Sequence, residues 1–400
     1  MNKTPKILIF THGQNWGAGI AATRLFNSFI SYGFFVKLLV AKKNNNDKNL
    51  TEISKVRLFK SFFISRVDLL ICKILEPENE TWKTGAFFGV LSARFFNKSN
   101  YDIINIHWLG HGLISLRQLL KINKPIVFTV NDEWLLNPIS HYPYQFEFKN
   151  KFRNFIKLKL SDGRLKLKKI LIMRENVYIV TVSQEIAEKF RNLFPEKSSK
   201  IYCIPNPIDK KEFFPDQKRT SNLISTVENY SNVIFLGGIN NMRKGWDLLE
   251  ASLKYCESRF KIIVQGATGR KTTGKNSQIE IAGVPYISKL DELRLLYSQA
   301  DLIVVPSRIE ALPQTATEAL SCGTPVVGFK IGGLLDIVID NLTGKLVPKF
   351  DVQSLASAID EVLYNGKKLY SSSCLDYATK NLHFEVVAKK YERIFSEVLY

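Results

Sequence analysis

The sequence predicts an α/β protein built of two doubly wound, Rossmann-like domains with a cleft between them. Three observations lead to this prediction. Short apolar runs rich in β-branched residues alternate with helix-length segments along almost the whole chain. The runs are continuously apolar, as expected of strands that are buried on both faces of a parallel sheet. Finally, 400 residues are too many for one ordinary core and comfortable for two.

The expected elements fall into two series. In the first, strands are expected at residues 6–10, 36–40, 102–106, 126–130 and 177–182, with a helix at 18–32. In the second, strands are expected at 233–236, 261–265, 301–305 and 325–329, with helices at 245–256, 291–298, 313–322 and 352–364. Between the series, residues 204–209 hold two prolines around an Asn, which can continue neither a helix nor a central strand. We therefore predict domains at 1–205 and 206–380, followed by an amphipathic helix at 381–400.

Composition narrows the class of protein. Apolar residues make up 45% and charged residues 23%, the balance of a globular chain. The apolar runs are too short for a membrane span, and the one near the N-terminus is too short for a secretory signal, so we expect a cytoplasmic protein. The five cysteines lie far apart without a CxxC pair, which predicts reduced thiols and neither a zinc site nor a disulfide.

The net charge of +19 calls for an anionic partner, which could be nucleic acid, an anionic membrane or a diphosphate. Two basic stretches, residues 57–75 and 151–174, interleave Lys and Arg with apolar residues. They could be ordinary helices whose cations reach around core contacts. Alternatively, they could dock the protein on anionic lipid as a peripheral membrane protein.

The segment 307–328 is the most informative part of the chain. It begins at the carboxyl end of the expected strand 301–305, where ligands bind in open α/β sheets. Pro313 suits the first turn of a helix, whose free N–H groups can hold a phosphate. Glu310 precedes this helix and Glu318 lies inside it, and each carboxylate could accept from two sugar hydroxyls. The alternative is a favourable dipole contact on a solvated surface.

This segment resembles the E-x7-E signature of the GT-B glycosyltransferases of family GT4. The similarity continues through Thr324-Pro-Val-Val, Gly332-Gly333 and Thr343-Gly344, with Asp336 where the family usually has Glu. The resemblance implies that Glu310 contacts the transferred sugar and Glu318 the ribose of a nucleotide-sugar donor. It also implies that Ala311, Leu312 and Pro313 line the donor, and that the final helix packs back on the first domain.

Residues 235–249 resemble the loop in which the family holds the donor diphosphate. Lys244 matches the family Lys, whereas Gly238 stands where an Arg is usual, so Arg243 is expected to supply the second cation. Two cations here would neutralise the nucleoside diphosphate as it leaves. The alternative is an exposed basic pair at a helix start.

In the first domain, Gly17 and Gly19 resemble the family's glycine loop, in which the backbone approaches the donor closely. His107 stands where relatives carry a His near the reacting centre, and we expect it to orient the acceptor or relay its proton. His12 is a second candidate on the acceptor side, although it could be an ordinary loop histidine. Asp132, in a loop with Asn131 replacing the family His, is expected to line the acceptor side.

The chain holds no Asp-x-Asp pair, so we expect neither a metal nor another cofactor. The predicted function is retaining transfer of a sugar from UDP- or GDP-sugar to a saccharide or lipid-linked acceptor in bacterial surface polysaccharide synthesis. A GT-B epimerase, a phosphorolytic enzyme and a basic nucleic-acid-binding protein are the alternatives. The two carboxylates disfavour nucleic acid, because they would repel a phosphate backbone.

Overall fold

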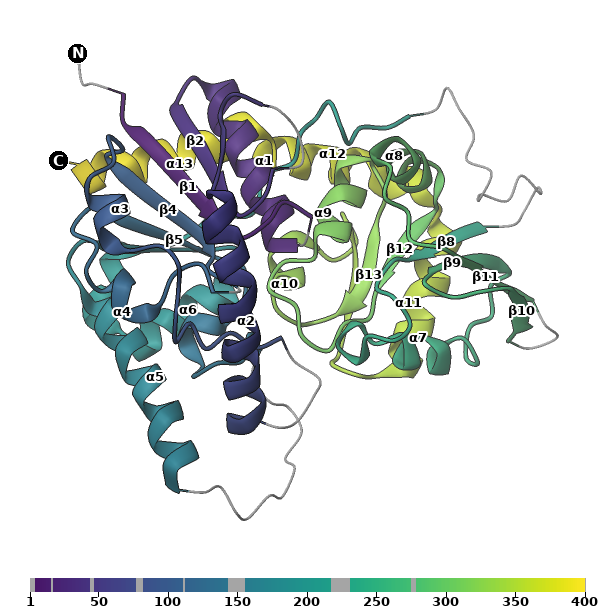
Figure 1. Ribbon diagram of the computed structural model, residues 1–400. Helices are drawn as coiled ribbons and strands as arrows, with labels where there is room; N and C mark the ends of the chain where they lie inside the picture. Colours follow the sequence, from purple (N-terminus) through teal and green to yellow (C-terminus); the bar gives the residue numbers. More distant parts are fainter. Residues whose placement is uncertain are drawn as a thin grey trace. The chain divides into compact units, whose positions relative to one another are not determined.

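The computed structural model describes residues 4–15, 17–43, 47–76, 82–110, 112–142, 155–216, 231–274 and 278–399. The chain divides into two compact units (Figure 1). Unit 1 comprises Met1–Asn206 and Val387–Tyr400, and unit 2 comprises Pro207–Val386. The change of unit at Asn206 lies one residue from the domain boundary expected at the proline-flanked loop.

Unit 1 is built on a parallel sheet with the strand order β3-β2-β1-β4-β5-β6-β7. Isoleucine and valine dominate the central strands, whose side chains are buried on both faces. The strands are β1 (Lys6–Thr11), β2 (Phe35–Val40), β3 (Leu50–Glu52), β4 (Ile103–Trp108), β5 (Ile126–Val130), β6 (Val177–Thr181) and β7 (Ile201–Cys203).

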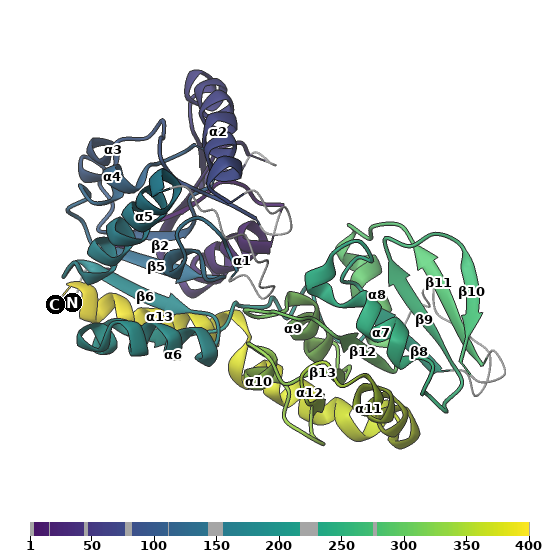
Figure 2. The same cartoon turned by 90° about the horizontal axis from the view of Figure 1, so that it is seen from below.

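Helices cover both faces of this sheet. Figure 2 shows α6 and α13 on one side of β6 and α5 on the other. The helices of unit 1 are α1 (Gly17–Tyr32), α2 (Lys55–Leu75), α3 (Ala93–Asn97), α4 (Leu116–Leu119), α5 (Phe155–Met173), α6 (Gln184–Leu193) and α13 (Phe384–Leu399), with 3-10 turns at Trp134–Leu136 and Pro195–Lys200.

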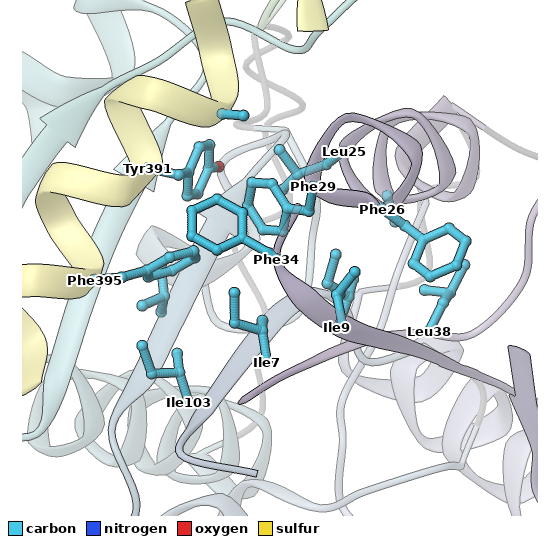
Figure 3. Packing of buried hydrophobic residues seen from close by; sticks show 14 of the residues in the cluster. Ile7, Ile9, Leu25, Phe26, Phe29, Phe34, Leu38, Ile103, Tyr391 and Phe395 are labelled. Carbon is cyan, nitrogen blue, oxygen red and sulfur yellow. The ribbon is translucent and has the colours of Figure 1, made fainter. Parts of the chain in front are cut away.

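The C-terminal helix α13 is part of the core of unit 1. Tyr391 and Phe395 pack edge-on against Phe29 of α1 (Figure 3). The Tyr391 hydroxyl also lies 2.9 Å from the Thr129 hydroxyl of β5. Burying an aromatic side chain of this size contributes roughly 1.5–3 kcal/mol, so these contacts hold α13 firmly on the first unit.

The final helix begins later than expected. The sequence predicts one helix from residue 381, but α12 (Lys367–Asn381) ends there and α13 starts at Phe384. Leu382 lies between them, and its carbonyl accepts a hydrogen bond from the Ile208 N–H at 2.8 Å. The interruption therefore joins the chain to the proline-flanked loop itself, which includes Ile208.

Unit 2 repeats the architecture with the strand order β10-β11-β9-β8-β12-β13-β14. All pairs are parallel except β10 with β11, which is antiparallel. The strands are β8 (Ser231–Phe235), β9 (Phe260–Gln265), β10 (Arg270–Thr273), β11 (Ile279–Val284), β12 (Leu302–Val305), β13 (Val326–Phe329) and β14 (Gly344–Val347). The helices are α7 (Trp246–Ser252), α8 (Leu290–Gln299), α9 (Gln314–Ser321), α10 (Leu334–Ile337), α11 (Val352–Asn365) and α12.

Two parts of the expected element list were incomplete. The expected strands are present, but β3, β7, β10, β11 and β14 were not expected. Four of these have only three or four residues, and β11 mixes glycine and a carboxylate into its apolar run. Pro313 was expected in the first turn of α9, but it is the N-cap residue.

Candidate active site

Each sheet changes its winding direction at one pair of neighbouring strands. In unit 1 the pair is β1 and β4, and in unit 2 it is β8 and β12. At such a point the connections diverge to opposite sides, and a crevice forms at the carboxyl ends of the strands. The candidate residues follow these strands: His12 follows β1, His107 lies near the end of β4, Lys244 follows β8 and Glu310 follows β12.

In unit 2, three candidate residues form one charged cluster. Arg243 Nη1 donates to both carboxylate oxygens of Glu310, at 3.0 and 2.9 Å, and to the Ile309 carbonyl at 2.9 Å. Lys244 Nζ donates to the same carboxylate. Glu310 is only 5% exposed, while Arg243 and Lys244 are about one quarter exposed. Two partly exposed cations thus meet one buried anion in a single cluster.

The electrostatics of this cluster favour an ionised Glu310. Burial alone raises the pKa of this carboxyl, but Arg243 and Lys244 outweigh burial and hold its pKa below the ordinary value. The pKa of Lys244 is lowered, because burial and the charge of Arg243 together outweigh the attraction of Glu310. A second anion beside this amine would favour its charged form and raise its pKa.

The backbone turn next to Arg243 and Lys244 leaves no room for a side chain at Gly245. Gly245, directly after Lys244, has a φ of +73°, and a Cβ there would lie 2.0 Å from the Pro306 carbonyl oxygen. Arg308 secures the same turn, since its N–H donates to the Arg243 carbonyl at 2.7 Å. Its guanidinium donates to both oxygens of Asp247, at 2.7 and 2.6 Å. This role of Arg308 was not predicted from the sequence, because nothing there distinguishes it from other surface cations.

A second glycine turn supports the loop that carries Glu310. Gly332 has a φ of +46°, and a Cβ on it would lie 1.7 Å from the Glu310 carbonyl oxygen. The next residue, Gly333, donates its N–H to the Ala311 carbonyl at 2.9 Å. This turn therefore packs directly against the backbone of residues 310 and 311, which explains the glycine pair in the motif.

Glu318 lies within α9, whereas the ion-paired Glu310 lies in the loop before this helix. Its carboxylate accepts a hydrogen bond from the hydroxyl of Tyr297 of α8 at 2.9 Å, and both residues are buried. The role of this tyrosine was not predicted from the sequence, because an aromatic residue on an amphipathic helix is usually part of the core. This bond fixes the rotamer of Glu318.

The segment between the carboxylates is compact. Ala311 and Leu312 are buried at 5% and 7% exposure. The Pro313 carbonyl accepts from the N–H groups of Ala316 and Thr317, at 3.1 and 3.2 Å. The first backbone N–H groups of α9 thus begin directly after the Glu310 loop, at the carboxyl end of β12.

In unit 1, His107 is a half-buried histidine that is held neutral. Burial lowers its pKa to about 3. Its Nδ1 lies 3.3 Å from the amide nitrogen of Asn131, which also donates to the Thr129 carbonyl. Since that carbonyl can only accept, Asn131 presents its NH2 group, so Nδ1 of His107 accepts and the proton resides on Nε2. This Nε2 is buried and has no hydrogen-bond partner among the described residues.

The other unit 1 candidates have different surroundings. His12 lies edge-on to Trp108, with ring centroids 5.4 Å apart, and its carbonyl accepts from the Ala41 N–H. A Cβ on Gly17 would have open space around it. At Gly19, by contrast, a Cβ would lie 2.1 Å from the Gly13 carbonyl oxygen. Gly19 therefore serves close packing within the chain, a correction to the expectation that both glycines admit a ligand.

Asp132 is held inside unit 1. Its Oδ2 lies 2.7 Å from Nδ1 of His141, and its Oδ1 accepts from the Trp134 N–H at 2.8 Å. Burial raises the pKa of Asp132, but His141 and the Trp134 N–H outweigh it and lower the value. Nε2 of His141 lies 2.9 Å from the Thr84 hydroxyl. His141 was missed because nothing in the sequence pairs it with Asp132.

Among the described residues, no group of three or more His, Cys, Asp and Glu side chains is arranged to hold a metal ion. None of the described helices has the length and apolarity needed to cross a bilayer. All five cysteines carry free thiols, and four of them are buried.

Comparison with known protein families shows to which family the chain belongs. The model for glycosyl transferases group 1 matches residues 230–365, and the model for glycosyltransferase family 4 matches residues 17–212. The chain belongs to the family 4 glycosyltransferases, and its two units have the GT-B fold of that family.

Solved structures share this fold over the whole chain. Sucrose-phosphate synthase from Thermosynechococcus elongatus superposes with a TM-score of 0.66 at 18% identity, covering 98% of this chain and 99% of that one. HepE of Anabaena, solved in complex with UDP-glucose, gives a TM-score of 0.63 at 15% identity, covering 98% and 100%.

Curated relatives are similar in sequence over part of their length. A D-inositol 3-phosphate glycosyltransferase of Mycobacterium sp. (strain KMS) is 28% identical over 202 residues, or 48% of this chain and 46% of the relative. An uncharacterized glycosyltransferase of Methanocaldococcus jannaschii is 26% identical over 297 residues, or 70% and 80%. The chain spans about half the length of the curated relatives that it matches first.

Proposed function

We propose that this protein transfers a sugar from a nucleoside diphosphate sugar, UDP- or GDP-linked, to a saccharide or lipid-linked acceptor, with retention of anomeric configuration and without a metal ion. The observation that carries the proposal is the cluster of Arg243, Lys244 and Glu310 at the carboxyl ends of β8 and β12. It places two cations and one carboxylate where a doubly wound sheet binds its ligand.

The cations would act on the leaving group. When the bond between the anomeric carbon and the diphosphate breaks, its electron pair passes to the phosphate oxygen. Arg243 and Lys244 would stabilise that growing negative charge, the task that a divalent cation performs in other transferases. The position of both cations after β8, one of the two strands at which the sheet changes its winding direction, supports this role.

The carboxylates would hold the neutral parts of the donor. Glu310 would accept hydrogen bonds from hydroxyls of the transferred sugar, and Glu318 from the ribose. In retaining transfer, the acceptor oxygen forms its bond to the anomeric carbon on the face that the phosphate leaves. The acceptor proton passes to the departing phosphate oxygen, so the charges balance without a separate base.

His107 would orient a substrate by donating a hydrogen bond. Its lowered pKa of about 3 makes it a poor proton acceptor at neutral pH. Its Nε2, which carries the proton and has no hydrogen-bond partner among the described residues, supports hydrogen-bond donation over the proton relay considered above. His12 and Asp132 would lie on the acceptor side as supporting groups.

We further propose that the reaction belongs to bacterial surface polysaccharide synthesis and takes place at the inner face of the cell membrane. The net charge of +19 supports an anionic surface as the place where the reaction occurs. A lipid-linked acceptor would be presented on such a surface.

A thermal-shift screen with UDP, GDP, ADP and CMP tests the donor assignment. UDP is the first choice, because HepE, which shares the fold, was solved with UDP-glucose. We expect UDP or GDP to raise the melting temperature of the wild type and to have no effect on Lys244→Ala. Lys254→Ala, which removes an exposed lysine of the same unit, is the matched control and should respond as the wild type does. Stabilisation by none of the four nucleotides would refute the assignment.

A further inference from the structure

Helix α2 carries large apolar side chains on its exposed face, where a helix on the surface of a unit usually carries polar ones. Its inner face buries Ser61, Asp68, Cys72 and Leu75. On the outside, large apolar side chains recur at helical spacing and lie between 48% and 66% exposed: Val56, Phe59, Phe63, Val67, Leu70 and Ile74. A contiguous apolar stripe of this kind marks an interaction site. We call it the α2 stripe.

The exposed charged residues of α2 itself are all positive. Lys55, Lys60, Arg66 and Lys73 are exposed on α2, and the Arg66 guanidinium lies 4.0 Å from the centre of the Phe62 ring. The one acidic residue of the helix, Asp68, is buried, and its carboxylate accepts from the N–H groups of Gly85 and Phe87. The exposed side of α2 thus combines an apolar stripe with cations alone.

A basic cavity of about 420 Å³ lies beside the first turns of α2. Arg57, Arg94 and Lys98 line it, together with the aromatic residues Phe95 and Tyr101 and the hydroxyl residues Ser92 and Ser99. No carboxylate occurs among the described residues that line this cavity. Three cations with neighbouring hydroxyls are the chemistry that binds a phosphate group.

We infer that the α2 stripe and this cavity form a docking surface for an anionic phospholipid bilayer. The aromatic and aliphatic side chains enter the acyl boundary, the flanking lysines and arginines lie among the head groups, and the cavity receives a lipid phosphate. A second copy of the chain is a poorer occupant, because two α2 helices would bring rows of like charges together. In Figure 1, α2 and its neighbour α5 extend beyond the edge of the unit 1 sheet.

Vesicle co-sedimentation tests the inference without any sugar donor. The full-length protein should bind vesicles of phosphatidylcholine mixed with phosphatidylglycerol at least about tenfold more tightly than vesicles of phosphatidylcholine alone. Phe59→Ser with Phe63→Ser should weaken that binding at least about tenfold. The control pair, Tyr364→Ser with Leu369→Ser, removes side chains of comparable exposure from unit 2 and should leave binding unchanged.

Charge reversal provides a second, independent pair of variants. Lys60→Glu with Arg66→Glu should abolish the preference for the anionic vesicles, whereas Lys254→Glu with Lys368→Glu, on exposed lysines of unit 2, should leave most of it. Equal binding to both kinds of vesicle, or equal losses in the α2 and unit 2 variants, would overturn the inference. So would a dimer, detected by sedimentation velocity, that the Phe59 and Phe63 substitutions dissociate.

The inference deepens the proposed location and rests on it only for its biological meaning. The UDP or GDP thermal shift depends on unit 2, so it should persist in every α2 variant. Loss of vesicle binding with an intact nucleotide response supports the docking surface. Intact vesicle binding without any nucleotide response would leave the docking surface standing and refute the transferase proposal instead.

Discussion

At the scale of single residues, the chemistry proposed for unit 2 depends on the charges that Arg243, Lys244 and Glu310 share. Glu310 is one buried anion between two cations, and both of its carboxylate oxygens already accept hydrogen bonds. A donor diphosphate would compete with this carboxylate for Arg243 and Lys244. Glu310 would then be released toward the sugar hydroxyls, so one rearrangement would prepare both halves of the donor site.

Glu310→Gln separates these two roles. The neutral amide no longer competes for the cations, so UDP should bind at least as tightly as to the wild type by isothermal titration. Transfer should fall by roughly 100-fold or more, because the amide holds the sugar and balances charge less well in the transition state. Glu361→Gln, which alters a carboxylate paired with Lys345 on the surface of unit 2, is the control. Tighter UDP binding with full activity would contradict the role of Glu310 in catalysis.

The lowered pKa of His107 predicts how the stability of the protein depends on pH. Its folded pKa of about 3 lies below the ordinary 6.5, so the unfolded chain binds the extra proton between these values. Stability from this residue is therefore complete above pH 6.5 and is lost progressively as the pH falls toward 3. From pH 7 to pH 5 the expected loss is roughly 2 kcal/mol.

Urea unfolding of the wild type and His107→Asn at pH 5 and pH 7 measures that contribution. The variant should lose clearly less stability than the wild type over this interval, because Asn does not titrate. Equal losses in the two proteins would mean that His107 is not held neutral by burial.

At the scale of elements, the glycine turns explain why the loops adopt one conformation. The turn at Gly332 lies directly against the carbonyl of Glu310, and the turn at Gly245 lies against that of Pro306. A side chain at either position would displace the backbone that carries a charged group of the cluster. These glycines therefore contribute to the site without offering any functional group.

Gly332→Ala tests this dependence, with Gly366→Ala as a matched control. Both glycines have positive φ, +46° and +75°, but a Cβ on Gly366 would meet no atom within 4 Å. Gly366→Ala should cost roughly 1–3 kcal/mol from backbone strain alone, because the φ of 75° and ψ of 147° at this residue suit only glycine. Gly332→Ala should cost about 1–3 kcal/mol more from overpacking and should abolish the UDP or GDP thermal shift. Equal destabilisation, with the nucleotide response retained in both, would show that the turn does not position Glu310.

At the scale of the whole molecule, the fold was largely predictable from the sequence. Continuous apolar runs marked the central strands, and the proline-flanked Asn206 marked the point at which the chain changes unit. Edge strands such as β3 and β7 could not be predicted, because a strand of three residues is too short to show a periodic pattern. The break between α12 and α13 could not be predicted either, because it depends on a hydrogen bond from Ile208, which is distant in the sequence.

The candidate site was predictable where a motif is contiguous. Lys244 and Glu310 could be named from local sequence, but their ion pair joins two segments that only the sheet brings together. Partners such as Tyr297, Arg308 and His141 carry no local signal of their role. Their roles follow only from the folded structure, which brings each of them next to a carboxylate: Glu318, Asp247 and Asp132, respectively.

A crystal structure of the protein with UDP tests the central claim most directly. We predict that the diphosphate lies at the carboxyl ends of β8 and β12, within hydrogen-bond distance of Arg243 and Lys244, with Glu310 released from at least one of them. A diphosphate bound elsewhere on the protein, with the Arg243, Lys244 and Glu310 cluster unchanged, would contradict the account.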